Sequence, residues 1–300
     1  MVTREISGQP VPKVSLCIPV YNGARFLAET MRSALAQDYP DFELVVSDNA
    51  STDETPQVVA GFDDPRIVYS RSERNLGPVG NFNRCLELAR GRYTKILCAD
   101  DLLYPTCLSR QVAILEEDAG QAISLVSCAR DIIDADSRVR WRSRPANFRG
   151  HLAAPEAIRR SAHSGTNLFG EPQAVLFRTA QGRQAGGFNP AYSFCLDLDF
   201  WFRLLALGDL YRIEESLCAF RVSQTSWSTG LSRHQAAEYH AFLGTFARQG
   251  HILSPADVRR GSRQAILNAY FRRLFYLWLA LPPWTPRASR RNPAQGATAP

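Results

Sequence analysis

The sequence has 300 residues, of which 45% are hydrophobic and 21% are charged. This composition excludes a disordered chain and is enough to bury a large core, as one large α/β domain or one domain with appendages. Its seven cysteines lack metal-ligand spacing, no apolar leader opens the sequence, and no stretch approaches the roughly 20 apolar residues that cross a bilayer, so we expect a cytoplasmic protein with reduced thiols.

The net charge of +6 is unevenly distributed along the sequence. Residues 259–300 contain eight arginines and no acidic residue, whereas the rest of the chain has 27 basic and 29 acidic residues. A basic end on a near-neutral body predicts contact with an anionic surface, either a membrane or a nucleic acid.

The first hundred residues alternate between strand and helix patterns. Apolar runs rich in β-branched residues predict buried strands at residues 14–20, 42–47, 66–70 and 92–98. Each of the first three is followed by a polar loop and a helical pattern, and the third helix is expected to end at Gly91. Strands separated by helices predict a mostly parallel sheet with right-handed crossovers.

The pattern after residue 101 is more mixed. The predicted elements are helices at 107–118 and 195–208, a strand at 122–130, a hairpin turning near 134–137, a short strand after a loop within 170–180, and a strand or strand pair at 210–223. From about residue 232 the sequence is helical, and after residue 284 it has the composition of a disordered basic tail.

Polar clusters follow three of the predicted strands. They occupy residues 19–22, 47–53 and 99–101. Because the carboxyl ends of parallel strands meet at one edge of a sheet and form its ligand-binding side, these clusters are expected to converge on one rim. Within the last cluster, Asp100 and Asp101 are adjacent like charges, which indicates a cation or several hydrogen-bond donors between them.

Several motifs, taken in order, resemble the family 2 glycosyltransferases, which are inverting enzymes of the GT-A fold. They are "PVYN" after the first strand, "SDNASTD" after the second, "RNLG" and "ARGRY" around the third helix, "ADD" after the fourth strand and "DLDFWFRL" from residue 197. The resemblance spans residues 14–225 and implies a Rossmann-like, mostly parallel sheet flanked by helices, with a helical C-terminal extension.

The resemblance implies transfer of a hexose or deoxyhexose from a UDP-, dTDP- or GDP-sugar to a hydroxyl acceptor, in polysaccharide or glycoconjugate assembly. Asp101 and Asp100 would hold Mn²⁺ or Mg²⁺, which bind carboxylates together with substrate phosphates. Cys98 stands where relatives often have a further acid, so the ligands rest mainly on Asp101, with Asp100 nearer the donor's ribose or sugar. The simpler interpretation is that the pair caps the following helix.

Other donor contacts also follow from the resemblance. Asp48 would accept a hydrogen bond from a pyrimidine N–H and Tyr21 would stack near that base, beside Pro19 and Asn22. Arg221 would meet the diphosphate, although Ser223 replaces the histidine that relatives have next to it. The alternatives are an Asx turn for Asp48, rim packing for Tyr21 and a surface position for Arg221.

Asp197 is the expected general base for an inverting transfer, which needs one carboxylate opposite the leaving diphosphate. Leu196 replaces the glutamate that relatives have beside it, and Asp199 is the rival candidate. Both acids are also compatible with the first turn of a helix. Glu171, Gln173 and Trp201 are expected on the acceptor side, although a solvated loop and simple packing explain them equally well.

The expected organisation is a flexible N-terminus at 1–12, a catalytic domain at 13–230, a helical extension at 231–284 and a disordered basic tail at 285–300. The catalytic domain would divide into a nucleotide-binding half, 13–101, and an acceptor half, 102–230. A nucleotide-sugar-binding protein without turnover is the alternative, whereas a Rossmann dehydrogenase is not expected because no G-x-G-x-x-G follows the first strand.

An apolar stripe lies within the predicted last helix, at positions 267, 270, 271, 274, 278 and 281. Such a stripe packs on a core in most proteins. The alternative is that the helix rests on an anionic membrane at the inner face of the cell, where a lipid-linked acceptor would be presented. Nucleic acid is not expected, because the tail lacks interleaved aromatic and basic residues.

Overall fold

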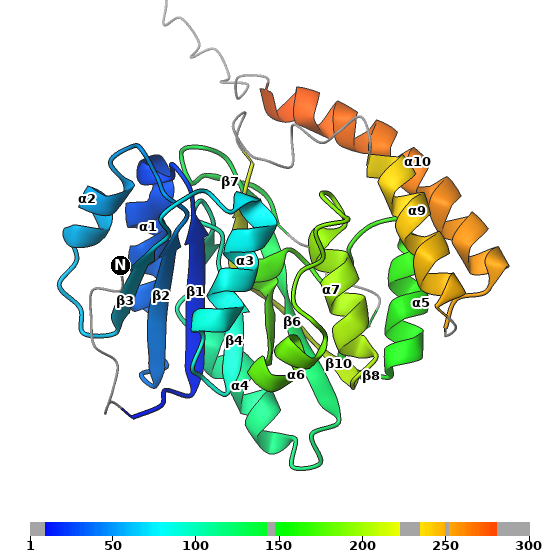
Figure 1. The fold of residues 1–300 in the computed structure, drawn as a ribbon. Helices are drawn as coiled ribbons and strands as arrows, with labels where there is room; N and C mark the ends of the chain where they lie inside the picture. The colour runs from blue at the N-terminus through cyan, green and yellow to red at the C-terminus, as the bar shows by residue number, and fades with distance from the viewer. Residues whose placement is uncertain (1–9, 143–147, 223–234, 250–251, 281–300) are drawn as a thin grey trace, which may run out of the picture.

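The computed structural model describes residues 10–142, 148–222, 235–249 and 252–280. A ten-stranded sheet forms its centre (Figure 1). The strands are β1 (Val14–Val20), β2 (Phe42–Asp48), β3 (Ile67–Arg71), β4 (Tyr93–Ile96), β5 (Leu102–Leu103), β6 (Ile123–Ile133), β7 (Val139–Trp141), β8 (Gly150–Leu152), β9 (Val175–Arg178) and β10 (Asp209–Arg221).

The main path of the sheet runs β3-β2-β1-β4-β9-β6-β10-β5, with β7 paired to β6 and β8 to β10. The first four strands are mutually parallel, and β9 is antiparallel to its neighbours β4 and β6. All seven residues of β1 are buried, as expected for a central strand covered on both faces. The predicted α/β class and the mostly parallel sheet are therefore confirmed.

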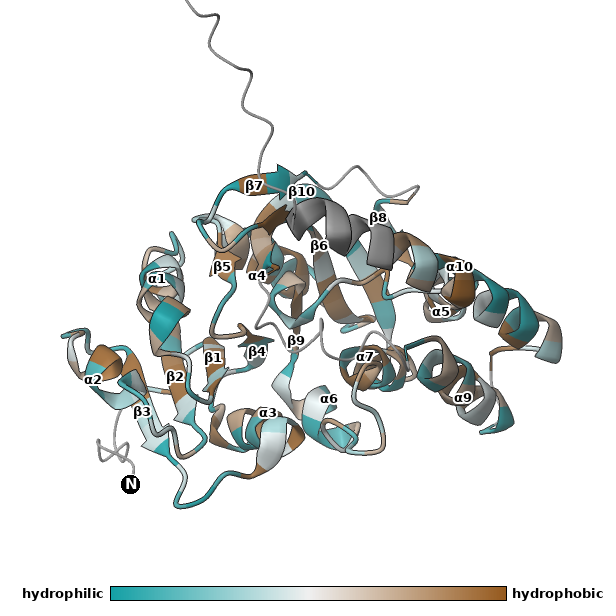
Figure 2. Ribbon diagram, turned by 90° about the horizontal axis from the view of Figure 1, so that it is seen from above, coloured by the Kyte–Doolittle hydropathy of each residue, from teal (hydrophilic) through white to brown (hydrophobic). Residues whose placement is uncertain are grey.

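Helices cover both faces of the sheet, as the view from above shows (Figure 2). The helices are α1 (Ala24–Leu35), α2 (Thr55–Ala60), α3 (Gly77–Leu88), α4 (Cys107–Glu117), α5 (Ala154–Ser164), α6 (Thr179–Gln184), α7 (Leu196–Leu205), α9 (Gln235–Arg248) and α10 (Pro255–Ala280), with a 3₁₀ turn η1 (Pro172–Ala174). One core joins α1, α2 and α4 to the sheet, and a second core joins α3, α5, α7 and α9 to its other face.

One local expectation and one of the alternatives were wrong. The third helix ends at Leu88, before Gly91, whose backbone lies so close to β1 that an added Cβ would approach the Ser15 nitrogen to 2.6 Å. Asp100 and Asp101 do not cap a helix, because the short strand β5 follows them and α4 begins only at Cys107. The helix α5 and the strand β8 were not predicted at all.

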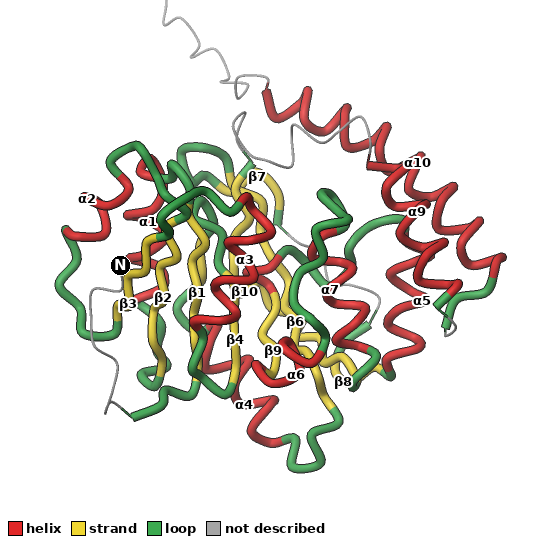
Figure 3. Tube along the Cα trace, in the orientation of Figure 1, coloured by secondary structure: helices red, strands yellow, loops and turns green. Residues whose placement is uncertain are grey.

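The helical C-terminal region packs on α5 at one side of the sheet (Figure 3). The second half of α10 lies at the end of the molecule where β1 and β2 end (Figure 1). Among the described residues, no helix is both long enough and apolar enough to span a bilayer. The expectations for residues 1–9, for Ser223 and for the basic tail fall outside the described residues.

Candidate active site

The loops that follow β1 and β2 are joined by hydrogen bonds. Asn22, which has a positive φ of 50°, accepts a 2.8 Å bond at its Oδ1 from the Thr52 amide. In return, the backbone N–H of Asn22 donates to Ser51 Oγ, and that of Ala24 donates to the Asp53 carboxylate. The two predicted polar clusters therefore form one continuous rim, with Asn22 as a structural link and Tyr21 half exposed beside it.

Asp48 lies at the end of β2 with its side chain fully buried. Its Oδ1 accepts from the Ser51 amide at 2.8 Å, as in the Asx-turn alternative, and its Oδ2 accepts from the Tyr69 hydroxyl at 2.5 Å. Arg71 Nη1 is 3.9 Å from Oδ2. The carboxylate is thus held rigidly at the end of β2 by the Asx turn and the Tyr69 hydroxyl, and it is covered by its surroundings.

The third loop joins the same rim through asparagines. Asn49 donates to Asn75 Oδ1 and to the Gly77 carbonyl, and accepts from the Leu76 amide. Asn81 on α3 donates to the carbonyls of Val20 and Ser47. These bonds place the "RNLG" segment against the ends of β1 and β2.

The carboxylates of Asp100 and Asp101 lie at the next strand end and differ in their surroundings. Asp101 is fully buried, and its Oδ1 accepts from the Arg221 backbone N–H at 2.8 Å. Its Oδ2 is buried without a hydrogen-bond partner among the described residues. Burial, followed by the charge of Asp100, raises the pKa of Asp101 well above its ordinary value, and burial also raises the pKa of Asp100.

Arg221 holds this segment in place. Its guanidinium is fully buried and donates to the Asp100 carbonyl at 2.6 Å, to the Asp134 carbonyl at 3.0 Å and to the Glu29 carboxylate at 2.8 Å. It also lies 4.5 Å from the ring centroid of Phe26. These contacts favour a structural tie between β10, α1 and the β6–β7 hairpin over the expected contact with a diphosphate.

Asp197 lies in the first turn of α7, and its Oδ2 accepts a 2.9 Å bond from Asn167 Nδ2. Burial, followed by the charge of Glu171, raises the pKa of the Asp197 carboxyl to about 7. The rival Asp199 instead forms a salt bridge of 2.5 Å with Arg203, one turn along the same helix. Asp197 is therefore the acid whose surroundings suit proton transfer near neutral pH.

Asn167 was missed by the sequence analysis. Its Nδ2 also donates to the Gly170 carbonyl, and its Oδ1 accepts from the amides of Phe169 and Gly170. The asparagine thus fixes both the Asp197 carboxylate and the loop that leads to Glu171. Its only signal in the sequence is an asparagine in a glycine-containing loop, which is typical of many turns.

The expected acceptor residues have different environments. Glu171 accepts a 2.8 Å bond from Arg130 on β6, and Gln173 is fully buried with neither amide atom paired among the described residues. Trp201 is fully buried, with its Nε1 donating to the Gly170 carbonyl. Trp201 therefore supports the loop from within the core and presents no exposed face to an acceptor.

Carboxylates from both halves of the site affect the pKa of the same thiol, that of Cys98. Burial raises the pKa of the Cys98 thiol well above its usual value, and the carboxylates of Asp101, Asp100, Asp197 and Glu171 add to this effect in that order. Because the effect of a charge on a pKa decays with distance, the Asp100–Asp101 pair and Asp197 all lie near Cys98. A neutral thiol there adds no metal ligand for a hard cation.

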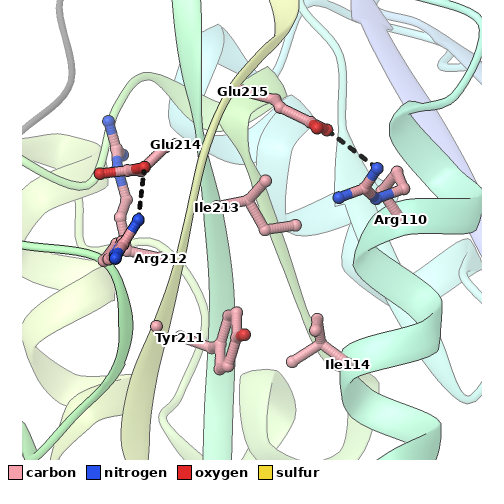
Figure 4. A pocket seen from close by; sticks show the side chains of 9 residues that line it. Arg110, Ile114, Tyr211, Arg212, Ile213, Glu214 and Glu215 are labelled. Carbon is pink, nitrogen blue, oxygen red and sulfur yellow. Dashed lines mark ion pairs between the residues drawn. The ribbon is translucent and has the colours of Figure 1, made fainter.

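A separate cavity of about 490 Å³ lies away from this rim (Figure 4). It is lined by α4, β8 and the first half of β10, and both of its glutamates are in ion pairs: Glu215 with Arg110 at 3.2 Å and Glu214 with Arg149 at 3.7 Å. Arg221, by contrast, is the last residue of β10. The cavity is therefore not part of the candidate active site.

Within the described residues, no three His, Cys, Asp or Glu side chains form a ready-made metal site. The chain itself offers the unpaired Oδ2 of Asp101 with Asp100 beside it. Two carboxylates completed by phosphate oxygens are a normal environment for Mg²⁺ or Mn²⁺. The residues present thus fit a cation that a diphosphate ligand helps to hold.

Comparison with known proteins gives a match to the family model "Glycosyl transferase family 2" over residues 15–180, more than half of the chain. An uncharacterized protein of Mycobacterium tuberculosis is 34% identical over 200 residues, covering 65% of this chain and 62% of that protein. An uncharacterized glycosyltransferase of Rickettsia typhi is 27% identical, covering 79% and 72%. The succinoglycan biosynthesis protein ExoO of Rhizobium meliloti is 36% identical, covering 43% and 36%.

Solved structures show the same fold. Residues 1–349 of Staphylococcus aureus TarS, in complex with UDP-GlcNAc, superpose with a TM-score of 0.66 at 19% identity, covering 90% of this chain and 76% of that one. A mannosyltransferase of Pyrobaculum calidifontis, in complex with GDP-Man and Mn²⁺, gives a TM-score of 0.61 at 22% identity, covering 91% and 77%. The predicted GT-A fold is therefore confirmed.

Proposed function

The chain belongs to glycosyl transferase family 2, as its motifs predicted, and on this basis we propose that it transfers a sugar from a nucleoside-diphosphate donor to a hydroxyl of a saccharide acceptor, with inversion. The observation that carries the proposal is the Asp197 carboxyl at the start of α7, held by Asn167, whose pKa is raised to about 7 by burial and then by the charge of Glu171. A carboxyl whose pKa is raised to about 7 suits a general base near neutral pH.

The donor is held by the rim that the first four strands form. Asp48 and the loop around Tyr21 receive the base and ribose, while Asp101 and Asp100 bind a divalent cation on the diphosphate. That cation would neutralise the charge that develops on the leaving diphosphate. Structures of the same fold hold UDP-GlcNAc, or GDP-Man with Mn²⁺, which supports a nucleotide sugar as the donor class.

Asp197 accepts the proton of the acceptor hydroxyl as the oxygen attacks the anomeric carbon from the side opposite the diphosphate. Asn167 orients the carboxylate, and Glu171, in the loop before η1, contacts the acceptor, whereas Gln173 is fully buried like Trp201 and does not reach it. Residues 13–101 thus serve the nucleotide and 102–230 serve the acceptor. The polysaccharide context of ExoO supports a saccharide acceptor, and the free state of all seven cysteines supports a cytoplasmic site of action.

The experiment is sugar transfer and donor hydrolysis with UDP-, dTDP- and GDP-sugars, with and without Mn²⁺. We expect Asp197→Asn to lower kcat by at least roughly 100-fold with nearly unchanged donor affinity, because only the removal of the acceptor proton is lost. Asp199→Asn is the matched control, since it changes the same helix turn but affects only the pair with Arg203. Asp101→Ala should instead weaken metal-dependent donor binding.

Each outcome tests one part of the proposal: the base, the turnover or the role of the metal. If Asp199→Asn is inactive while Asp197→Asn retains turnover, the base is assigned two residues too early. If donor binds to the wild-type chain and neither transfer nor hydrolysis occurs with any sugar, the chain is a nucleotide-sugar-binding protein without turnover. Full activity after removal of divalent metal would remove the role given to Asp101.

A further inference from the structure

The helix α10 presents large apolar side chains to solvent. Ile266, Leu267, Tyr270 and Phe271 are 50%, 51%, 64% and 67% exposed, respectively. Four large apolar residues within six positions form a contiguous patch, which is unusual for a surface helix that has no partner. Of the stripe expected from the sequence, Leu267, Tyr270 and Phe271 are thus exposed and do not pack on the core, whereas the side chains at 274, 278 and 281 lie outside the described residues.

The opposite face of α10 is the one that packs. Ala265 is buried, an added Cβ at Gly165 would meet its backbone, and Asn268 Nδ2 donates to the Ser164 carbonyl at 2.7 Å. Gly261 lies against the Ala162 carbonyl on α5. These residues recur every three or four positions, so one stripe of α10 is fixed to the domain and the other stripe is left outward.

The outward stripe is also basic. Arg259, Arg260 and Arg263 are exposed, and their spacing from Ile266, Leu267 and Tyr270 places them on the same side of the helix, one to two turns earlier. No acidic residue occurs in the sequence after Asp257. An apolar patch extended by arginines is the pattern of a helix that lies on an anionic lipid surface.

We propose that this outward stripe of α10, residues 259–271, docks the chain on an anionic membrane surface. The apolar side chains enter the acyl boundary, while the arginines contact lipid headgroups. The stripe lies on the first half of α10, on the side of the molecule where α9 and α5 lie (Figure 1). This proposal concerns binding alone and holds whether or not the chain transfers a sugar.

The test is co-sedimentation of the full chain with vesicles of phosphatidylcholine alone or mixed with an equal amount of phosphatidylglycerol. We expect binding only to the anionic vesicles, with weakening as salt rises. Replacing Arg259, Arg260 and Arg263 by glutamine should lower the partition coefficient roughly 100-fold, because each arginine near an anionic surface contributes about a factor of five. Arg110, Arg138 and Arg149 replaced by glutamine is the control for the same change in net charge elsewhere.

A second variant, Leu267→Ser with Tyr270→Ser and Phe271→Ser, should also lose binding although its charge is unchanged. These residues are exposed, so the fold and the soluble-donor hydrolysis should be intact. Equal binding by the wild type and either variant would overturn the proposal, as would binding that ignores lipid charge. So would a dimer in sedimentation velocity that the serine variant abolishes without any vesicle binding, because a second copy would then occupy the patch.

Discussion

The Asp197 carboxyl owes its raised pKa first to burial and then to the charge of Glu171. We expect Glu171→Gln to lower the pKa of Asp197, because a negative neighbour that opposed ionisation is gone and the remaining Arg130 favours the carboxylate. The base must be deprotonated to act. The raised pKa predicts an acidic limb near pH 7 in the wild-type pH profile of kcat/KM, and Glu171→Gln should move this limb to lower pH.

Glu215→Gln is the control for this shift, since it removes a carboxylate that is paired with Arg110 in the separate cavity. Its acidic limb should stay in place. If Glu171→Gln lowers the maximal rate without moving the limb, Glu171 contacts the acceptor but does not set the proton affinity of Asp197. A pH-independent rate in the wild type would contradict the assignment of the base itself.

At the scale of elements, Arg221 joins β10 to α1 and to the β6–β7 hairpin. Lysine keeps the charge but cannot reproduce a planar group that donates to Asp100, Asp134 and Glu29 at once. We expect Arg221→Lys to lower the free energy of unfolding by about 2 kcal/mol, because buried carbonyls lose their donors. Urea unfolding measures this, with Arg138→Lys on the exposed hairpin as control.

The same variant separates two roles for Arg221. If the arginine binds the diphosphate, donor affinity measured by calorimetry should fall while stability is retained. If it is a structural tie, stability should fall and donor affinity should follow only through the displaced Asp100 carbonyl. The contacts in the structure predict the second result.

Local patterns predicted the elements that carry their own signal, and failed where distant residues decide. The buried run of β1 and the helix around Asp197 were recognised because their apolar spacing is set within a few residues. Asn167 could not be recognised, since its bond to Asp197 joins residues 30 positions apart. Arg221 resembled a phosphate ligand in sequence because nothing local shows that its guanidinium turns back into the protein.

The same limit applies to Gly91. A glycine just after a helix predicts a C-terminal cap. At position 91, however, glycine is needed because β1, 76 residues earlier in the chain, passes close to its backbone. The convergence of the strand ends, in contrast, followed from topology alone, because parallel strands share one rim. Rules about whole sheets therefore predicted the rim where the strand ends meet better than rules about single residues predicted local structure.

At the scale of the molecule, the C-terminal helices form a layer fixed to α5 by close backbone approach. An added Cβ at Gly261 would run into the Ala162 carbonyl and lie 2.8 Å from Leu243 Cδ1. We expect Gly261→Ala to destabilise the protein by about 1–3 kcal/mol, as overpacking does, and to increase hydrogen exchange along α10. The donor rim lies on the other half of the sheet, so donor affinity should be unchanged.

Gly244→Ala is the matched control, because it adds the same methyl group to α9 where the nearest atom would be Arg248 Nη1 at 3.5 Å. This change should stabilise the helix by up to about 1 kcal/mol, since alanine is the better helix former. If Gly261→Ala lowers the free energy of unfolding and Gly244→Ala raises it, the layer is held by close packing along the line where α10 contacts α5. Equal effects on unfolding would mean that α10 moves freely on α5, and its outward stripe would then have no fixed direction toward a membrane.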